Sequence, residues 1–365
     1  MPDLTTARRM LRVLAALAKS HLAREAFVNN LLKEMSYAHG LLRSLGHPRI
    51  FQLETTNHCP YTCIMCPRTH GMTRALGHMD IGLFRTIIDQ LRPAWQVEGV
   101  RTPPLMRLFH FGEPMVYRYF VESVAHCHHR GLHVLISTNP SVWTERRIEE
   151  VLDVQLDRMC VMVDGMDDGT SMAIRGKVAS FVRGVENIRT LAERKCRRGL
   201  KKPRITIAMI KQPRNSHHRD LFTKYWKEIE GIDAVEVAPF SIFAGDIAEI
   251  NRLGSEMEGQ DAEQAAWAER MRRQSALPCY YPWHSMSVTW DGKAVPCCRD
   301  HNAVKVLGDL TKDSLEDIWN GSRMQALRRE FLQAKVSSAP CATCNERSLE
   351  TGLPGSFYPI ARLLR

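Results

Sequence analysis

Apolar and polar positions follow a repeating pattern from residue 49 onwards, in which short strand-like runs alternate with stretches of helical spacing. The strand-like runs are Ile50–Glu54, Leu108–Phe111, His133–Ser137, Met159–Val163, Ile205–Ile210 and Val235–Phe240. Apolar residues recur at helical spacing in residues 80–92, 115–130, 145–153, 173–196 and 219–229. Strands that alternate with helices in this way predict a parallel sheet and an α/β fold, here a partial (β/α)6, TIM-like barrel.

Different patterns flank this region. The first residues show helical spacing without strand alternation, and the last quarter is rich in turns, aromatic residues and cysteines. A hairpin is predicted there, with Ser285–Trp290 turning at Asp291 and Gly292 and returning through Lys293–Val295. We therefore expect a helical extension, the barrel, a charged helical connector, a small α+β domain and a tail, at residues 1–48, 49–245, 246–278, 279–350 and 351–365.

Composition argues against a membrane protein. The 365 residues are 44% apolar and 25% charged, and no run approaches the ~18 apolar residues of a spanning helix. The apolar segment between Arg12 and Lys19 is short for a signal peptide. We therefore expect a cytoplasmic protein, in which eleven cysteines indicate metal or redox chemistry rather than disulfides.

The net charge of +10 is concentrated in residues 194–204, which hold seven positive charges and no negative one. This run precedes the fifth predicted strand, so it should lie at the end of the barrel opposite the chemistry. We expect a solvated loop; docking to an electron donor, an acidic protein or an anionic lipid surface is the alternative. No nucleic-acid recognition module is visible, so no nucleic-acid partner is expected. The N-terminal helices should pack on the barrel, with peripheral membrane contact as the alternative.

Three cysteines, Cys59, Cys63 and Cys66, follow the first predicted strand with the spacing C-x3-C-x2-C. Three thiolates can bind three corners of a [4Fe–4S] cluster and leave one iron open. A structural zinc site would need a fourth ligand, and the candidate, His58, directly precedes Cys59. The isolated Cys127, Cys160 and Cys196 are interpreted as buried or idle thiols.

This arrangement resembles the signature of the radical S-adenosylmethionine (SAM) superfamily. The resemblance implies that the open iron binds the amino and carboxylate groups of SAM. Reductive cleavage of SAM then gives a 5′-deoxyadenosyl radical, which abstracts a hydrogen atom from the substrate. Gly112-Glu113-Pro114 resembles the family's GGEP motif, with Phe111 in place of the first glycine. The resemblance assigns SAM binding to Met65, Gly112, Glu113, Pro114, Ser137, Asn139 and Arg175.

The C-terminal cysteines follow a second pattern, Cys279-x12-Gly292-x4-Cys297, completed by Cys341-x2-Cys344. It resembles the SPASM domain in its shortened, twitch form, since Glu350 and Pro354 occupy the later cysteine positions. The resemblance implies one auxiliary [4Fe–4S] cluster, bound by Cys279, Cys297, Cys341 and Cys344. Cys298 is an alternative to Cys297, and a zinc ribbon is an alternative to the cluster.

The resemblance leaves the reaction open. One hypothesis is oxidation or epimerisation of a carbinol carbon in a sugar- or cyclitol-like molecule, with the auxiliary cluster as electron relay and a flavodoxin or ferredoxin as electron donor. The second is a peptide maturase that cross-links or epimerises a ribosomal peptide; residues 1–48 lack the strand pattern of a leader-binding domain. A non-catalytic zinc or iron–sulfur scaffold is the remote alternative. The sequence does not identify a catalytic base or hydrogen donor.

Overall fold

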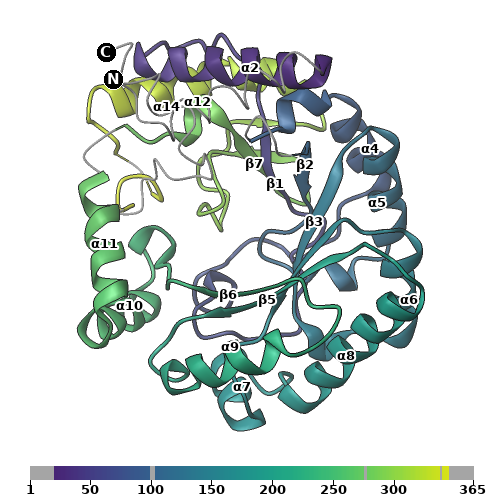
Figure 1. Ribbon diagram of the computed structural model, residues 1–365. Helices are drawn as coiled ribbons and strands as arrows, with labels where there is room; N and C mark the ends of the chain where they lie inside the picture. Colours follow the sequence, from purple (N-terminus) through teal and green to yellow (C-terminus); the bar gives the residue numbers. More distant parts are fainter. Residues whose placement is uncertain (1–19, 99–102, 275–277, 338, 345–365) are drawn as a thin grey trace, which may run out of the picture.

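The computed structural model describes residues 20–98, 103–274, 278–337 and 339–344. Five parallel strands form the main sheet, in the order β2-β3-β4-β5-β6. They are β2 (Leu105–Arg107), β3 (His133–Thr138), β4 (Arg158–Met162), β5 (Arg204–Ile210) and β6 (Ala234–Ala238). Helices α4 (Ile81–Asp89), α5 (Phe120–His129), α6 (Glu145–Asp153), α8 (Phe181–Arg197) and α9 (Arg219–Lys227) lie outside the strands (Figure 1). The sheet is thus the wall of a partial barrel, as predicted.

The first barrel strand, β1 (Ile50–Leu53), belongs to a second sheet with the order β1-β7-β8-β9. It pairs in parallel with β7 (Met286–Val288), which forms the predicted hairpin with β8 (Lys293–Val295); β9 is Gly308–Asp309. On the edge of β1 that faces β2, the side-chain amide of the buried Gln96 pairs with the backbone of Ile50. In the amide orientation that satisfies both of its polar atoms, the Gln96 nitrogen donates to Ile50 O (3.0 Å) and the Gln96 oxygen accepts from Ile50 N (3.1 Å). The C-terminal domain therefore continues the barrel wall.

All predicted strands but the second agree with the structure to within two residues. Of the predicted helices, that at 80–92 ends three residues early, at Asp89, and that at 115–130 begins five residues late, at Phe120. Two further predictions are wrong. The second strand ends at Arg107, whereas we expected it at Leu108–Phe111. After Leu108 the chain leaves the sheet, and Phe111 packs against Phe243 and His301 inside the barrel. The helix expected at residues 173–196 is two helices, α7 (Asp168–Arg175) and α8. Gly176, with a φ of +87°, ends the first of them.

The described part of the N-terminal extension is helix α2 (His21–Ala38), which packs against the C-terminal domain rather than only on the barrel. The Tyr37 hydroxyl donates to Pro278 O (2.8 Å), and that of Tyr280 donates to Glu34 Oε1 (3.0 Å). Two C-terminal helices, α12 (Tyr281–His284) and α14 (Ser322–Leu332), complete this end. Among the described residues, no helix is long and apolar enough to cross a membrane. Residues 1–19 and the expected tail lie outside the described residues.

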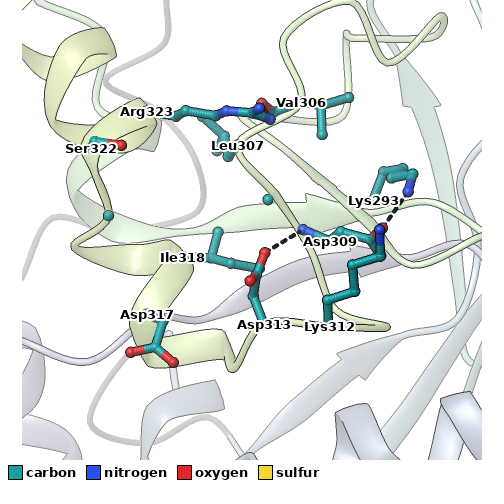
Figure 2. A pocket seen from close by; sticks show the side chains of 12 residues that line it. Lys293, Val306, Leu307, Asp309, Lys312, Asp313, Asp317, Ile318, Ser322 and Arg323 are labelled. Atoms are coloured by element: carbon teal, nitrogen blue, oxygen red, sulfur yellow. Dashed lines mark hydrogen bonds and ion pairs between the residues drawn. The ribbon is translucent and has the colours of Figure 1, made fainter.

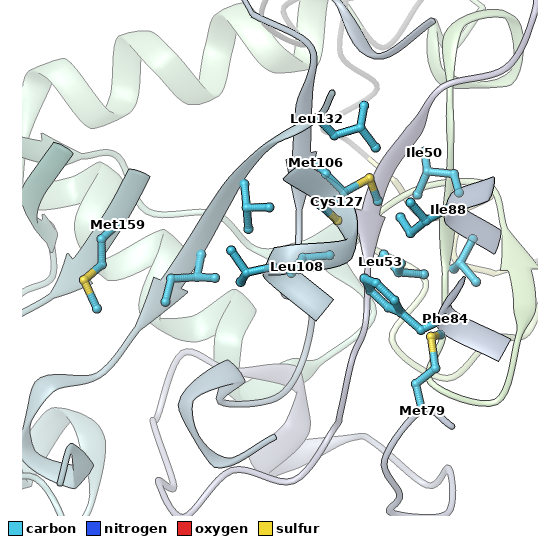
Figure 3. Packing of buried hydrophobic residues seen from close by; sticks show 14 of the residues in the cluster. Ile50, Leu53, Met79, Phe84, Ile88, Met106, Leu108, Cys127, Leu132 and Met159 are labelled. Atoms are coloured by element: carbon cyan, nitrogen blue, oxygen red, sulfur yellow. The ribbon is translucent and has the colours of Figure 1, made fainter. Parts of the chain in front are cut away.

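One large cluster of buried apolar side chains runs through both sheets. Figure 3 shows its part around Ile50, Leu53, Met106 and Phe84. The same cluster includes Val288, Ala294 and Trp319 of the C-terminal domain. Because the burial of apolar surface is the main stabilising force, these two parts of the chain stabilise each other.

The basic run at residues 194–204 is largely paired with acidic side chains. Arg194 contacts Glu145 and Glu149 of α6 at 2.6 Å, and Arg198 contacts Glu149 and Asp153 of the same helix. Lys195 pairs with Asp233, and Lys202 pairs with the buried Asp157. Much of the positive charge of this run is therefore neutralised by neighbouring acidic side chains. Fewer unpaired cations are available to attract an acidic partner than the sequence indicates. Helices α10 (Ala248–Gln260) and α11 (Ala262–Gln274) form the connector.

Candidate active site

The candidate active site is a cavity of about 270 Å³ inside the barrel. Its lining comes from the loop after β1, the ends of strands β3 to β5 and the C-terminal domain. In parallel barrels, chemistry takes place at these C-terminal strand ends. Cys59, Cys63 and Cys66 all line it, and so does Cys298.

The loop that carries Cys59, Cys63 and Cys66 is fixed by backbone hydrogen bonds to the end of α7. Thr62 N donates to Arg175 O (3.1 Å), and Ile64 N donates to Ile174 O (2.9 Å). Gly176 follows directly, and a Cβ atom there would lie 2.0 Å from Thr62 Oγ1. The loop and the helix end are thus packed backbone against backbone.

The donor set of this loop fits an iron–sulfur cluster, because thiolates are the ligands that such clusters use. Burial raises the pKa of Cys59 and of Cys63 to about 12, and it also raises the pKa of Cys66. The free thiols are therefore protonated at neutral pH, and binding of iron must release these protons. Among the described residues, no three His, Cys, Asp or Glu side chains converge as ligands of one metal ion; a four-iron cluster binds each cysteine through a different iron.

The predicted SAM-binding residues divide into two groups. Met65, Gly112, Ser137, Asn139 and Arg175 line the cavity, whereas Glu113 and Pro114 do not. Gly112 approaches the backbone of the loop before Cys59 so closely that a Cβ atom would lie 2.0 Å from Thr56 O. The position therefore requires glycine for packing, and the roles of all seven residues in SAM binding remain predictions.

Glu113 is fully buried and its carboxylate accepts four hydrogen bonds. Oε1 accepts from Met115 N (3.0 Å) and Thr138 Oγ1 (2.6 Å). Oε2 accepts from the backbone N and the Nδ2 of Asn139, both at 2.8 Å. Burial raises the pKa of Glu113 although these donors oppose the shift. Its carboxylate thus holds Asn139 towards the cavity.

Arg175 links that network to the cysteine loop. Its guanidinium contacts Asp164 Oδ2 (2.6 Å), donates to Asn139 Oδ1 and approaches Cys63 Sγ (3.8 Å). Burial by itself would lower the pKa of Arg175, but the Asp164 carboxylate together with Cys63 and Tyr61 outweighs it, and the pKa lies above its usual value. A permanent positive charge therefore faces both the ligand Cys63 and the space beside Asn139, where it would favour a thiolate and a bound carboxylate.

The second cysteine set also comes together in the structure. Burial raises the pKa of Cys297, and the thiol of its neighbour Cys298, followed by those of Cys341 and Cys279, raises it further. Burial raises that of Cys341 as well, with further contributions from Cys279 and Cys344. Cys297 thus lies near Cys279 and Cys341, and Cys344 lies near Cys341, while Cys298 lines the barrel cavity. This separation favours Cys297 as the cluster ligand.

Sequence reasoning missed several residues of the site. Gln52, His110 and Phe243 line the cavity, and Glu54 lies behind it. The Glu54 carboxylate accepts from both Arg74 Nη1 (2.9 Å) and Arg74 Nη2 (2.8 Å), from Trp290 N (3.1 Å) and more weakly from Phe111 N (3.4 Å). A polar residue in the apolar strand β1, Gln52, was a signal that could have been read from the sequence.

A larger hollow, about 470 Å³, lies away from all the cysteines, in the C-terminal domain (Figure 2). Two of its charged side chains form an ion pair, with Lys293 Nζ 2.5 Å from Asp309 Oδ2, and Asp309 N donates to Asp313 Oδ2 (3.1 Å). It contains no thiol and none of the predicted site residues. Size alone therefore does not make it the active site.

Two family models match this chain. Residues 53–216 match the radical SAM superfamily, and residues 279–345 match SPASM, an iron–sulfur cluster-binding domain. The matched SPASM region extends one residue beyond the last described residue, and Glu350 and Pro354 lie outside the described part.

Curated relatives are similar over most of their length. A tungsten-containing aldehyde ferredoxin oxidoreductase cofactor-modifying protein of Pyrococcus furiosus is 23% identical, over 81% of this chain and 86% of that protein. A SAM-dependent 2-deoxy-scyllo-inosamine dehydrogenase of Niallia circulans is 20% identical, over 83% of this chain and 94% of the relative. A PqqA peptide cyclase of Methylocella silvestris is 23% identical, over 82% and 80%.

Solved structures share the fold. Streptococcus suis SuiB bound to its precursor peptide SuiA superimposes with a TM-score of 0.58 and 12% identity, over 82% of this chain and 70% of SuiB. BtrN in complex with AdoMet and 2-DOIA superimposes with a TM-score of 0.50 and 17% identity, over 82% and 94%. The radical SAM domain implies SAM and a [4Fe–4S] cluster, and the SPASM domain implies auxiliary iron–sulfur binding. With its cysteine loop at the strand ends of a partial barrel, the chain belongs to the radical SAM superfamily as an enzyme with a C-terminal SPASM domain.

Proposed function

We propose that this enzyme abstracts a hydrogen atom from a carbinol carbon of a small sugar- or cyclitol-like molecule and thereby oxidises or epimerises it. The observation that carries the proposal is the meeting of two cysteine regions at one cavity: Cys59, Cys63 and Cys66 on the barrel side and Cys298, next to Cys297, on the other. A substrate between them is close to both the radical source and the C-terminal cysteines.

SAM and its cluster, when bound, supply the radical that removes the hydrogen atom. The chain's own residues bind and enclose the reactants. Arg175 and Asn139 offer a cation and an amide to the polar groups of SAM. Phe111 and Phe243, whose ring centroids are 6.1 Å apart, form an apolar wall that excludes water from the reacting carbon.

A relative of this chain supports a small-molecule substrate. The Niallia circulans dehydrogenase, whose name gives a cyclitol-type substrate, is matched over nearly its whole length.

A peptide maturase is the second candidate, because the PqqA peptide cyclase is a relative of comparable identity. Within the described residues 20–49, the chain forms one helix and no strand, so this part does not form the winged helix of many leader-binding domains. That helix packs on the C-terminal domain. We expect a flavodoxin- or ferredoxin-type electron donor for either reaction.

The proposal is tested with anaerobically reconstituted protein, SAM and a strong reductant. We expect conversion of SAM to 5′-deoxyadenosine by the wild type and none by the Cys59→Ala/Cys63→Ala/Cys66→Ala variant. Sugars and cyclitols deuterated at their carbinol carbons are then added singly, and deuterium in 5′-deoxyadenosine is measured by mass spectrometry. Transfer from peptides alone, with no transfer from any sugar or cyclitol, would refute the small-molecule proposal in favour of the maturase.

A further inference from the structure

Three arginines gather around one largely buried carboxylate in the barrel. Arg49 precedes β1, Arg107 ends β2 and Arg158 begins β4. Arg49 Nη1 lies 3.0 Å from Glu98 Oε1, and Arg107 Nη1 lies 2.6 Å from the same oxygen. Burial by itself would raise the pKa of Glu98, but Arg49, Arg107 and, more weakly, Arg158 outweigh it and hold the pKa below its usual value. These three arginines are called the arginine cluster below.

Strand register places this cluster on the inner face of the barrel. Arg107 pairs with Leu135 of β3, which pairs in turn with Arg158 of β4. Ser137 and Met162, which line the candidate active site, follow Leu135 and Arg158 by two and four residues. Residues two apart in a strand lie on the same face, so Arg158 faces the same interior as Met162. At ~3.3 Å a residue, the cluster lies about 7 to 13 Å along the strands from the cavity-lining residues.

The Phe51 ring joins the arginine cluster to the candidate active site. The guanidinium carbon of Arg107 lies 4.7 Å from the centroid of this ring, which packs edge-on against Tyr281 with 5.5 Å between centroids. The Tyr281 hydroxyl lies 3.8 Å from the sulfur of Cys298, which lines the cavity. Gln52 follows Phe51 and also lines the cavity, and its buried Oε1 has no hydrogen-bond partner among the described residues. A polar molecule in the cavity could therefore meet both the amide and the cluster.

Positive charge in the arginine cluster is not balanced. Three guanidinium groups facing one carboxylate leave an excess of two positive charges. The Arg49 side chain is 7% exposed, and its buried Nε has no hydrogen-bond partner in the described part of the chain. Burial, together with the charge of Arg49, lowers the pKa of the nearby Lys33 to about 7. Because buried charges without partners are costly, a bound anion would stabilise this region.

One further acidic side chain lies on the inner face of the barrel. Glu236 of β6 pairs through Ala208 of β5 with Met162, so it lies at the level of the cavity and not of Arg158. It is exposed, and it forms no ion pair with the described arginines. Glu236 therefore does not neutralise the cluster.

We propose that the substrate is a phosphorylated sugar or cyclitol, whose phosphate binds Arg49, Arg107 and Arg158 while a carbinol carbon lies in the cavity. This inference rests on the proposed function and makes its substrate class more specific. A phosphate carries about −1.5 to −2 charges at neutral pH, which matches the excess of two, whereas a carboxylate would balance only half of it. Guanidinium groups also suit phosphate because their N–H donors bind two oxygens at once.

Binding of inorganic phosphate tests the cluster without radical chemistry. Isothermal titration calorimetry at constant ionic strength compares full-length, reconstituted wild type with Arg158→Gln. Arg158 forms no hydrogen bond or ion pair with another described residue, so the fold should persist, which circular dichroism checks. We expect the wild type to bind phosphate and Arg158→Gln to bind it at least about tenfold more weakly, because a hydrogen bond between charged groups is lost.

Arg198→Gln is the matched control, because it removes a guanidinium from the outside of the barrel. Arg198 contacts Glu149 at 3.1 Å and Asp153 at 2.7 Å, both on α6. We expect this variant to bind phosphate like the wild type. The inference would be overturned by a wild type that does not bind phosphate, by unchanged affinity in Arg158→Gln, or by an equal loss in Arg198→Gln.

A matched pair of ligands tests the substrate class. myo-Inositol and myo-inositol 1-phosphate differ only in the phosphate, and glucuronate offers a carboxylate instead. We expect the phosphate ester to bind at least about tenfold more tightly than inositol, and Arg158→Gln to lose this preference. Tighter binding of glucuronate than of the phosphate ester would contradict the assignment to phosphate.

The deuterium-transfer assay separates this inference from the proposed function. Transfer to 5′-deoxyadenosine from neutral sugars or cyclitols, with none from their phosphate esters, would overturn the inference and leave the proposed function intact. Transfer from peptides alone would refute the proposed function, and the inference with it. We expect transfer from a phosphate ester in the wild type and in Arg198→Gln, and its loss in Arg158→Gln.

Discussion

Glu113 shows how one buried side chain orders a candidate binding site without lining it. Its family resemblance predicts direct contact with the SAM amino group, but its two oxygens already accept from Met115, Thr138 and Asn139. The cavity-lining residue is Asn139, which also accepts from Arg175. We therefore expect Glu113 to act on SAM by positioning Asn139.

Replacement of Glu113 by alanine should lower both stability and SAM affinity. It leaves the buried donors of Thr138 and Asn139 unpaired, which typically costs about 1–3 kcal/mol for a buried group. Release of Asn139 should weaken SAM binding about tenfold, equivalent to about 1.4 kcal/mol. Thermal unfolding and equilibrium binding of SAM measure the two effects.

Two comparisons make this prediction specific. Glu228→Ala, at an exposed position after α9, should change stability by no more than about 0.5 kcal/mol. If Glu113 acts through Asn139, the double variant Glu113→Ala/Asn139→Ala should bind SAM about as weakly as Asn139→Ala alone. Additive losses of affinity would show that Glu113 contacts SAM independently.

At the scale of elements, the end of α7 determines where the cysteine loop lies. The loop has two backbone hydrogen bonds to Ile174 and Arg175, and the chain turns away at Gly176 with a φ of +87°. A side chain at Gly176 would both strain the backbone and collide with Thr62, in the middle of the cysteine motif.

Gly176→Ala should therefore reduce iron binding in the barrel, because displacement of Thr62 moves Cys59 and Cys63 on either side of it. Gly199→Ala is the matched control: Gly199 also has a positive φ, +61°, but a Cβ atom there meets nothing within 4 Å. We expect both variants to lose about 1 kcal/mol from backbone strain. Only Gly176→Ala should lose about half of the iron, as measured after reconstitution. Equal iron content in the two variants would contradict the role of this contact.

At the scale of the whole molecule, the barrel and the C-terminal domain are one structural unit. Strand β1 pairs with β7, and the apolar core is continuous. Helix α2 is hydrogen-bonded to Pro278 and Tyr280, the residues on either side of Cys279. The C-terminal domain, with Cys298, is thereby held at the barrel cavity. Loss of this domain's cluster should consequently affect the stability of the barrel as well as the chemistry.

The variant Cys341→Ala/Cys344→Ala tests this coupling. We expect it to lose about half of the iron and to unfold at a lower temperature in a single transition, because β1 and β7 share a sheet. It should still cleave SAM, since Cys59, Cys63 and Cys66 remain, but product formation should fall. Differential scanning calorimetry, gel filtration and the 5′-deoxyadenosine assay measure these effects. Two separate unfolding transitions, with the barrel transition unchanged, would refute the coupling.

Much of the protein could be read from local sequence. The cysteines of the first motif lie within eight residues, so their chemistry depends on a single loop and its spacing. The alternation of strands and helices and the Asp291-Gly292 turn are also local, because periodicity and turn conformation are properties of neighbouring residues. The family resemblance rests on these local features and was confirmed.

Tertiary structure decided the rest. The apolar run Leu108–Phe111 resembles a strand, but it leaves the sheet because Phe111 packs inside the barrel. Cys297 and Cys298 are adjacent in the sequence, and only the packing of β1 against the C-terminal hairpin shows which thiol faces the cavity. Strand pairing and burial join residues more than two hundred positions apart, such as Ile50 and Met286, whose local patterns do not specify each other.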